Sequence, residues 1–266
     1  MKAQSKILIG LPVFKRDWIL PLWFECIEKQ DFPLENIGFI FVLAEQEEDP
    51  NTWEVLQSWH NAHPEVSTFE LITHTNKQSH NTHPGKDGIR EWGMYKYLTM
   101  VELRNELIDK AAIHTEFDYF FSLDSDILLA DPQTLNKLTT HIEGRDVISP
   151  LMYMAPYDTS YPSAMTWRFY GNQMSLCQAV REMGQIGEVF EVDIVMAAVM
   201  MNKHVFTDPN IGYMPHPQGE DLGFAWVLKQ LGYKSYAAWD TYCPHIMGED
   251  ILADYIKTGI DGRNPF

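Results

Sequence analysis

The chain has 266 residues, with 20 Lys and Arg residues against 37 Asp and Glu residues, which gives a formal net charge of −17. Hydrophobic residues make up 45% of the chain, so a chain of this length can bury a sizeable core without disulfides or a structural metal. The negative charge argues against a broad electrostatic grip on DNA, RNA or anionic lipid, because those partners are also negatively charged.

The cysteines and the hydropathy of the chain narrow the class of protein further. The three cysteines stand far apart, at positions 26, 177 and 243, and no Cys-x-x-Cys pair indicates a zinc ribbon or a disulfide framework. The longest apolar stretch near the N-terminus, residues 7–14, is too short to span a bilayer, and two basic residues end it. We therefore expect a cytoplasmic protein without a signal peptide or transmembrane segment. Its oligomeric state is left open.

The first third of the chain alternates strands and helices. An apolar strand over 6–12 ends in a proline turn, and Asp17 is the expected N-cap of a helix whose apolar residues recur at spacings of 4 and 3. A second, wholly apolar strand covers 37–44, which is typical of the middle of a parallel sheet. Thr52 is the expected cap of a short helix, and 68–72 forms a third strand.

A long polar loop at 73–91 separates this region from a helix over 92–112, whose apolar stripe is interrupted by Asn105. A loop of this length in a compact domain is usually functional or mobile. The later strands are predicted at 118–123, 146–151, 192–201 and 234–239, and the later helices at 133–142 and 220–231. A second long loop, rich in Tyr, Met, Pro and Trp, covers 152–175, and a polar tail from Gly248 is expected to be partly disordered.

The alternation of strands and helices predicts an α/β domain, with a mostly parallel sheet flanked by helices on both faces. Ligands of such sheets bind beyond the carboxyl ends of the strands. We therefore expect the turn at 12–16, the segment 44–49 and the segment 124–126 to lie on one rim of the sheet.

Two carboxylates, Asp124 and Asp126, follow directly after the predicted strand 118–123, with Ser125 between them. Carboxylate oxygens at this spacing suit a hard divalent cation. An Asp-x-Asp pattern arises by chance about once in a chain with this many Asp residues, so the pattern alone is weak. Its position at a strand end on the expected rim favours a cation site over a solvated turn.

Two later features carry less weight by themselves. Glu220 and Asp221 open the predicted helix 220–231, and His245 follows the last predicted strand. Acidic residues favour helix N-termini for electrostatic reasons alone, and a lone His is more often structural than catalytic. The dipole of the helix is expected to lower the pKa of Asp221 and to keep it ionised at neutral pH.

The order of these features resembles that of GT-A fold glycosyltransferases and is similar to the large family 2 group, with a related arrangement in the Anp1/Mnn9-type mannosyltransferases. The matching segments, in chain order, are IGLPVFKRDW, FPLENIGFIFVL, VELRNELIDKA, DYFFSLDSDILL, VDIVMAAVMMNKHVF, GEDLGFAWVLKQLGY and CPHIM. The resemblance implies a Rossmann-like GT-A single domain over 1–247, with a nucleotide-sugar-binding half at about 1–130, an acceptor-binding half at about 131–247 and a C-terminal tail at 248–266.

The resemblance also implies roles for the acidic residues. Asp126 would ligate Mn²⁺ or Mg²⁺ directly, Asp124 would face the ribose or reach the metal through water, and His245 would supply a further metal contact. Asp221, with Glu220 beside it, matches the family's Glu-Asp pair, in which the Asp commonly acts as base on the acceptor hydroxyl.

A further set of residues matches positions that bind the nucleotide sugar in relatives. They are Pro12, Val13, Phe14, Arg16, Glu45, Arg104, Asn105, Asp124 and Ser125. Within this set Arg16 would contact phosphate, Glu45 would contact the base, and Asn105 would be hydrogen-bonded beneath the site, since a polar residue on an apolar stripe is costly otherwise. The sequence departs from family 2 after the first and second strands, and also where Met196-Ala197-Ala198 replaces a common Gly pair.

The function implied is metal-dependent transfer of a sugar from a nucleoside diphosphate sugar to a hydroxyl of a small molecule, a glycan, a protein or a modified nucleic acid. A divalent ion neutralises the charge of the leaving diphosphate, which allows an acidic protein to bind an anionic donor. Inverting and retaining stereochemistry both stay open.

Two alternatives are weighed against this reading. A non-catalytic nucleotide-sugar-binding module would keep the pocket without turnover. A sugar nucleotidyltransferase would need a Gly-rich phosphate loop with Arg or Lys after the first strand, which Gly10-Leu-Pro-Val-Phe lacks.

Overall fold

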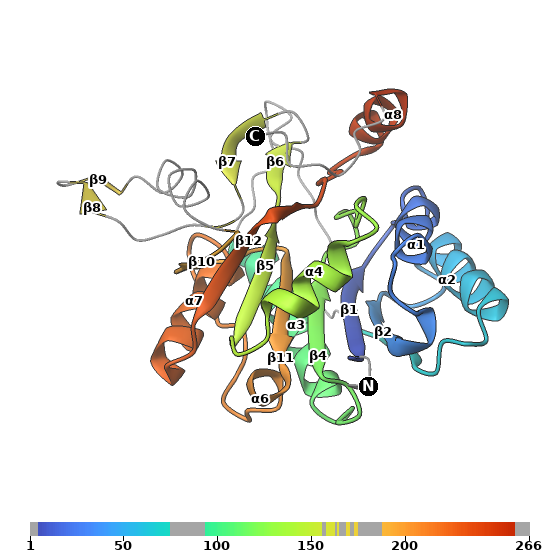
Figure 1. Cartoon of the computed structure of the whole chain (residues 1–266). Helices are drawn as coiled ribbons and strands as arrows, with labels where there is room; N and C mark the ends of the chain where they lie inside the picture. The colour runs from blue at the N-terminus through green and yellow to red at the C-terminus, as the bar shows by residue number, and fades with distance from the viewer. Residues whose placement is uncertain are drawn as a thin grey trace.

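An eight-stranded sheet forms the centre of the protein in the computed structural model (Figure 1). The structure describes residues 5–74, 94–155, 158–162, 164, 169–170, 173–174 and 188–258; for residues 94–95, and for 153–174 apart from Ala164, it describes the backbone alone. The strands of this sheet are β1 (Ile7–Val13), β2 (Ile37–Leu43), β3 (Phe69–Thr73), β4 (Tyr119–Leu123), β5 (Val147–Leu151), β10 (Val189–Val192), β11 (Ala198–Asn202) and β12 (Ser235–Tyr242).

The strand order is β10-β12-β5-β11-β4-β1-β2-β3. The pairs β4–β1, β1–β2, β2–β3 and β12–β5 are parallel, whereas β11 runs antiparallel to both β4 and β5, and β10 runs antiparallel to β12. Every residue of β2 and β4 is buried, as their sequences, apolar apart from Ser122, predict for the middle of a sheet. The mostly parallel sheet expected from the sequence is confirmed.

Helices cover both faces of the sheet. They are α1 (Leu20–Glu28), α2 (Pro50–Ala62), α3 (Met94–Ala111), α4 (Thr134–His141), α6 (Lys203–Phe206) and α7 (Glu220–Leu231), with α8 (Glu249–Thr258) near the C-terminus and a 3₁₀ turn at Leu34–Asn36. Apolar residues of α1, α2 and α4 pack in one core cluster, and those of α3, α6 and α7 pack in another. Successive side chains of β1 point to opposite faces of the sheet, so the strand contributes to both clusters. Ile7 and Ile9 belong to the first cluster, and Leu8 belongs to the second.

Three predicted elements differ from the structure. The predicted strand 192–201 takes in the last residue of β10 and most of β11, two strands that lie three places apart in the sheet order, and residues 193–197 between them belong to neither strand. The predicted loop 152–175 contains two short antiparallel pairs, β6 (Tyr153–Ala155) with β7 (Asp158–Pro162) and β8 (Phe169–Tyr170) with β9 (Gln173–Met174). The polar tail begins with α8, whose Ile251, Leu252 and Tyr255 pack on the first core cluster.

The N-cap predictions for the first two helices are wrong. The first helix, α1, begins at Leu20 after Ile19 rather than after Asp17, with a proline in its first turn. In α2 Asp49 occupies the N-cap position, and Thr52 lies inside the first turn. The Asp49 side chain makes no capping hydrogen bond, because it and the Thr52 side chain bind another segment, the turn after β1.

Other expectations are confirmed or lie outside the described residues. α7 ends at Gly232, whose φ of 82° is the left-handed conformation predicted for a helix C-terminus. The predicted loop 73–91 lies outside the described residues apart from Thr73 and His74. Within the described ranges, no helix is long and apolar enough to cross a bilayer.

Candidate active site

The turn after β1 meets the start of α2 at the rim of the sheet. Lys15 has a φ of 53°, which is uncommon for a residue with a side chain. Its backbone N–H donates to Asp49 Oδ2 at 2.6 Å, and the N–H of Arg16 donates to Thr52 Oγ1 at 3.1 Å. These two side chains therefore fix a strained turn, and sequence reasoning had assigned neither of them to the site.

The turn directs the side chain of Arg16 toward the segment after β4. Its Nε donates to Ser125 Oγ at 3.2 Å, and its Nη2 lies 3.4 Å from Asp126 Oδ2. On the other side, His245 Nε2 lies 3.5 Å from Asp126 Oδ1. His245 is placed there by the backbone, because Ile127 and His245 form an isolated antiparallel bridge.

These contacts set the charge of the group. Burial raises the pKa of Asp126, but the hydrogen bond and charge of His245, together with Arg16, outweigh it and leave that pKa below its ordinary value. Burial lowers the pKa of His245, and Asp126 more than offsets this and raises it. An ionised carboxylate and an imidazole at 3.5 Å form a donor set that suits a divalent ion such as Mn²⁺.

Asp124 faces a different partner. Arg104 Nη2 donates to both carboxylate oxygens of Asp124, at 2.8 and 3.1 Å. The backbone N–H of Asp124 donates to the Ala197 carbonyl at 2.8 Å. Burial and the neighbouring charges of Asp126 and Glu220 raise its pKa to about 6, although Arg104 opposes this. With both oxygens bonded to Arg104, Asp124 is less suited than Asp126 to bind a cation directly.

Arg104 connects the two acidic groups of the site. Its side chain is 2% exposed, its Nη1 donates to Ser122 Oγ at 3.2 Å, and its Nε lies 3.4 Å from Glu220 Oε1. Its guanidinium carbon also lies 5.4 Å from the centre of the Tyr213 ring. Burial lowers the pKa of Arg104, but Asp124 and the other acidic neighbours raise it further, so the guanidinium stays charged.

Arg104→Met is expected to lower the free energy of unfolding by about 3–5 kcal/mol, because it leaves buried carboxylates without their cation. Urea denaturation at neutral pH measures this. Arg145→Met is the matched control, since the Arg145 guanidinium donates to the His141 carbonyl and lies over the Tyr236 ring. Equal losses in the two variants would contradict the connecting role of Arg104.

Asp221 opens α7 and lies beside this network. Its Oδ1 is buried and accepts no hydrogen bond from a described residue, while the Ala197 N–H bonds to its carboxylate. Burial, and then the charges of Glu220 and Asp124, raise the pKa of Asp221 to about 8, although Arg104 opposes them. The lowered pKa expected from the helix dipole is therefore wrong, because burial outweighs the dipole.

Ala197 is a site residue to which sequence reasoning gave no role. Its φ of 59° is left-handed, its N–H bonds to Asp221, and its carbonyl accepts the N–H of Asp124. Within the described residues, it and Lys15 are the two non-glycine residues with positive φ, and both lie at this site. The signal was present in the sequence, since Ala197 stands where a Gly pair is common in family 2.

The other residues predicted to bind the nucleotide sugar are less closely connected to these acidic groups. Pro12 and Val13 lie in β1, and Phe14 follows it with 36% of its surface exposed. The side chain of Glu45 is exposed and makes no described contact with the acidic groups of the site. Asn105 bonds to the backbone of Tyr213, at 2.6 and 3.0 Å, on the chain that leads into α7.

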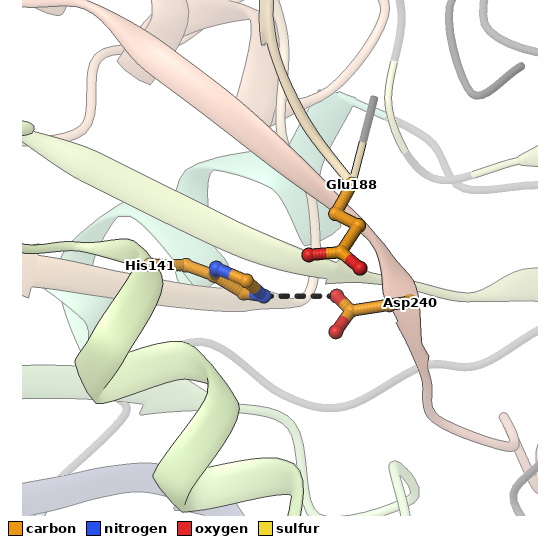
Figure 2. Close-up of side chains that lie close together, drawn as sticks. All are labelled: His141, Glu188 and Asp240. Carbon is orange, nitrogen blue, oxygen red and sulfur yellow. Dashed lines mark hydrogen bonds and ion pairs between the residues drawn. The ribbon is translucent and has the colours of Figure 1, made fainter. Parts of the chain in front are cut away.

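A second group of possible metal ligands lies elsewhere on the sheet (Figure 2). His141 at the end of α4, Glu188 before β10 and Asp240 in β12 each place one ligand atom within 4.8 Å of the others. His141 Nε2 lies 3.0 Å from Asp240 Oδ1. Sequence reasoning missed this group because its members are far apart in the chain and follow no spacing motif.

Comparison with known proteins agrees with this architecture. The model of the family described as "Glycosyltransferase family 25, N-terminal domain" matches residues 4–228. A glycosyltransferase 25 family member of Aedes aegypti is 22% identical over 210 residues, covering 79% of this chain and 33% of the relative. Procollagen galactosyltransferase 2 of Mus musculus is 21% identical over 224 residues, covering 82% of this chain and 34% of the relative. The chain thus spans about a third of the length of the curated relatives it matches.

Solved structures share the fold. The mannosyltransferase PcManGT of Pyrobaculum calidifontis, in complex with GDP-Man and Mn²⁺, aligns with a TM-score of 0.58 at 13% identity, over 99% of this chain and 67% of its own. S. aureus TarS 1–349 in complex with UDP-GlcNAc aligns with a TM-score of 0.53 at 15% identity, over 94% of this chain and 61% of its own. The GT-A resemblance read from the sequence is confirmed, and the match over residues 4–228 shows that the chain belongs to glycosyltransferase family 25.

Proposed function

We propose that this chain is a metal-dependent glycosyltransferase that binds a nucleoside diphosphate sugar at the rim of the sheet and transfers the sugar to a hydroxyl. The observation that carries the proposal is the contact of Arg16 and His245 with Asp126, next to the buried network of Asp124, Arg104 and the start of α7. Asp126, His245 and Arg16 offer ligands for a cation and a diphosphate. The network at the start of α7 offers carboxylates for proton transfer.

The relatives support this activity and suggest a first sugar to test. Four of the curated relatives are named as procollagen galactosyltransferases, among them those of mouse and human, and solved neighbours hold GDP-Man with Mn²⁺ or UDP-GlcNAc. We therefore propose galactose as the first sugar to test, with UDP as its carrier. The acceptor is a hydroxyl of a protein, a glycan or a small molecule, and the modified nucleic acid considered above is disfavoured by the charge of −17.

The proposed metal is Mn²⁺ or Mg²⁺, held by Asp126 and His245. When bound, it neutralises the negative charge that grows on the leaving diphosphate. Asp124 is the proposed partner of the ribose or of a metal-bound water, since Arg104 already engages its oxygens. Arg16 lies beside Ser125 and Asp126, where its guanidinium is suited to hold a diphosphate oxygen.

Asp221 is the proposed base. An unpartnered carboxylate oxygen can accept the proton of an attacking hydroxyl, and a pKa of about 8 allows it to titrate near neutral pH. Glu220, bound to Arg104, holds the start of α7 in place beside it. This role belongs to an inverting reaction; in a retaining reaction Asp221 would have another role.

Two expectations stay predictions. The cytoplasmic location is one, because it was inferred from cysteine spacing and hydropathy alone. The division of 1–247 into a donor half and an acceptor half is the other. The alternative of a non-catalytic binding module is separated from the proposal by turnover, since it predicts nucleotide binding without release of the nucleoside diphosphate from a donor.

A thermal-shift panel tests the proposed donor site. UDP, GDP, ADP, CMP and TDP are each added with Mn²⁺ and again with EDTA. A ligand at about 100 times its Kd adds about 2.7 kcal/mol of stability, which raises the Tm of a domain of this size by about 5–10 °C. We expect such a shift for one nucleotide with Mn²⁺ and its loss with EDTA. A panel without any Mn²⁺-dependent shift would contradict the proposal.

A further inference from the structure

One face of α3 holds the chain between α6 and α7. Tyr97, Arg104 and Asn105 lie seven and eight positions apart, which places them on the same side of a helix. A Cβ at Gly219, the N-cap of α7, would lie 3.7 Å from Tyr97 Cε1. Arg104 contacts Glu220, the first residue of α7.

Asn105 binds this chain most closely. Its Oδ1 accepts the Tyr213 N–H at 2.6 Å, and its Nδ2 donates to the Tyr213 carbonyl at 3.0 Å. A Cβ at Gly212 would lie 3.0 Å from Asn105 Oδ1, so the backbone approaches the amide at a distance that suits glycine. Both ends of the amide are thus bonded to one residue of the backbone rather than directed at the donor.

The held segment in turn supports α7. The Tyr213 ring stacks on Phe224 with the ring centres 4.3 Å apart. A Cβ at Gly223 would lie 1.8 Å from the Met214 carbonyl oxygen, so α7 rests directly on the backbone of Met214. The two contact positions on α7 are two and three residues beyond Asp221.

We propose that Asn105 is a positioning residue, which holds residues 211–214 against α7 and thereby sets the place of Asp221 relative to Asp124. The inference rests on the proposed function, since Asp221 is the proposed base. It also revises the role that the resemblance implied for Asn105, from nucleotide-sugar binding to support of the base. A misplacement of about 1 Å at a reacting group can cost about 100-fold in rate.

Asn105→Ala and the control Asp109→Ala, an exposed acidic residue on the same helix, test this inference. Hydrogen–deuterium exchange is measured over residues 211–221, and UDP release from UDP-galactose with Mn²⁺, with water as the acceptor of galactose, gives kcat and KM. We expect faster exchange over 211–221 and a kcat lowered about 100-fold in Asn105→Ala, with the KM and the Mn²⁺-dependent UDP shift unchanged. Asp109→Ala should match the wild type in all of these.

A second pair of variants guards against a folding defect. Asn105→Asp keeps an acceptor for the Tyr213 N–H but loses the donor to its carbonyl, so its kcat should lie between those of Asn105→Ala and the wild type. Gly223→Ala should reproduce the Asn105→Ala pattern, because the added methyl collides with Met214.

Unchanged exchange over 211–221, an unchanged kcat, or loss of the UDP shift in Asn105→Ala would each overturn the inference. The last result would return Asn105 to the donor pocket. Failure of the proposed function looks different, since the wild type itself would then neither bind UDP with Mn²⁺ nor release it. In that case the exchange comparison still decides whether Asn105 holds the segment.

Discussion

Asp221→Asn is expected to slow sugar transfer by about 10²–10⁴-fold while the protein still binds UDP with Mn²⁺. The amide that replaces the carboxylate cannot accept the proton of an attacking hydroxyl, and general-base catalysis contributes about 10²–10⁴-fold to a rate. The proposed ligands Asp126 and His245 lie on other elements and keep their own contact at 3.5 Å. The expected result is therefore a fall in kcat by that factor, with the Mn²⁺-dependent thermal shift of UDP preserved.

The measurement is the rate of UDP release from UDP-galactose, with UDP-GlcNAc and GDP-mannose tested in parallel. Asp109→Asn makes the same chemical change at an exposed position of α3 and should leave the rate unchanged. A wild-type rate in Asp221→Asn would place the base elsewhere or indicate a retaining reaction. Loss of the thermal shift would instead assign Asp221 to donor binding.

The raised pKa of Asp221 adds a pH dependence to this prediction. With a pKa of about 8 in the folded protein and an ordinary value of 3.8, the native state binds a proton that the unfolded state lacks between these limits. The stability contributed by this proton is present at low pH and is lost as the pH rises through about 8. The ionised form needed for catalysis grows over the same range, so the wild-type rate should rise with pH.

Urea denaturation at about pH 5 and about pH 9 checks the sign of this effect. Asn cannot ionise, so Asp221→Asn should become more stable relative to the wild type as the pH rises. A stability difference that is constant across this range would show that Asp221 is already ionised at low pH.

Asp126→Ala is expected to eliminate both metal-dependent nucleotide binding and turnover. The Asp126 carboxylate lies 3.4 Å from Arg16 and 3.5 Å from His245. Of the two proposed metal ligands, Asp126 and His245, it is the anionic one, so the variant leaves the cation with the neutral imidazole alone. The full Mn²⁺-dependent shift, about 5–10 °C in the wild type, should disappear. UDP release from UDP-galactose should fall to background.

The second group of possible ligands provides the matched control. Asp240→Asn and His141→Ala remove ligands of the other cluster, which shares no residue with the Asp126 site (Figure 2). Both variants should keep the UDP shift and the turnover. If these variants lost the shift and Asp126→Ala kept it, the catalytic metal would belong to His141, Glu188 and Asp240.

The parts of the fold that could be predicted are those that local sequence dictates. The strands β1 and β2 are continuous apolar runs, β4 is apolar apart from Ser122, and α7 has an apolar face and a C-terminal glycine, so their patterns indicated them directly. The run 192–201 is apolar apart from Asp193, but hydrophobicity alone does not reveal that a chain leaves one sheet position and enters another. Sequence periodicity therefore located the strands better than their order.

The site was predictable in its residue types and less so in its contacts. Asp124, Asp126 and Asp221 stood out because carboxylates follow a strand or open a helix at recognisable places. The binding of Asp124 to Arg104, and the burial that raises the pKa of Asp221, depend on tertiary packing, which no local pattern encodes. Ala197 was noticed as a departure from the Gly pair, but its two hydrogen bonds required the structure.

The position of the metal tests the proposed site most directly. Crystals grown with Mn²⁺ and UDP would be measured at a wavelength where manganese scatters anomalously. We expect a peak bound by Asp126 and His245, with diphosphate oxygens completing its coordination near Arg16. A peak between His141 and Asp240 with none at Asp126, or UDP bound away from this rim, would contradict it.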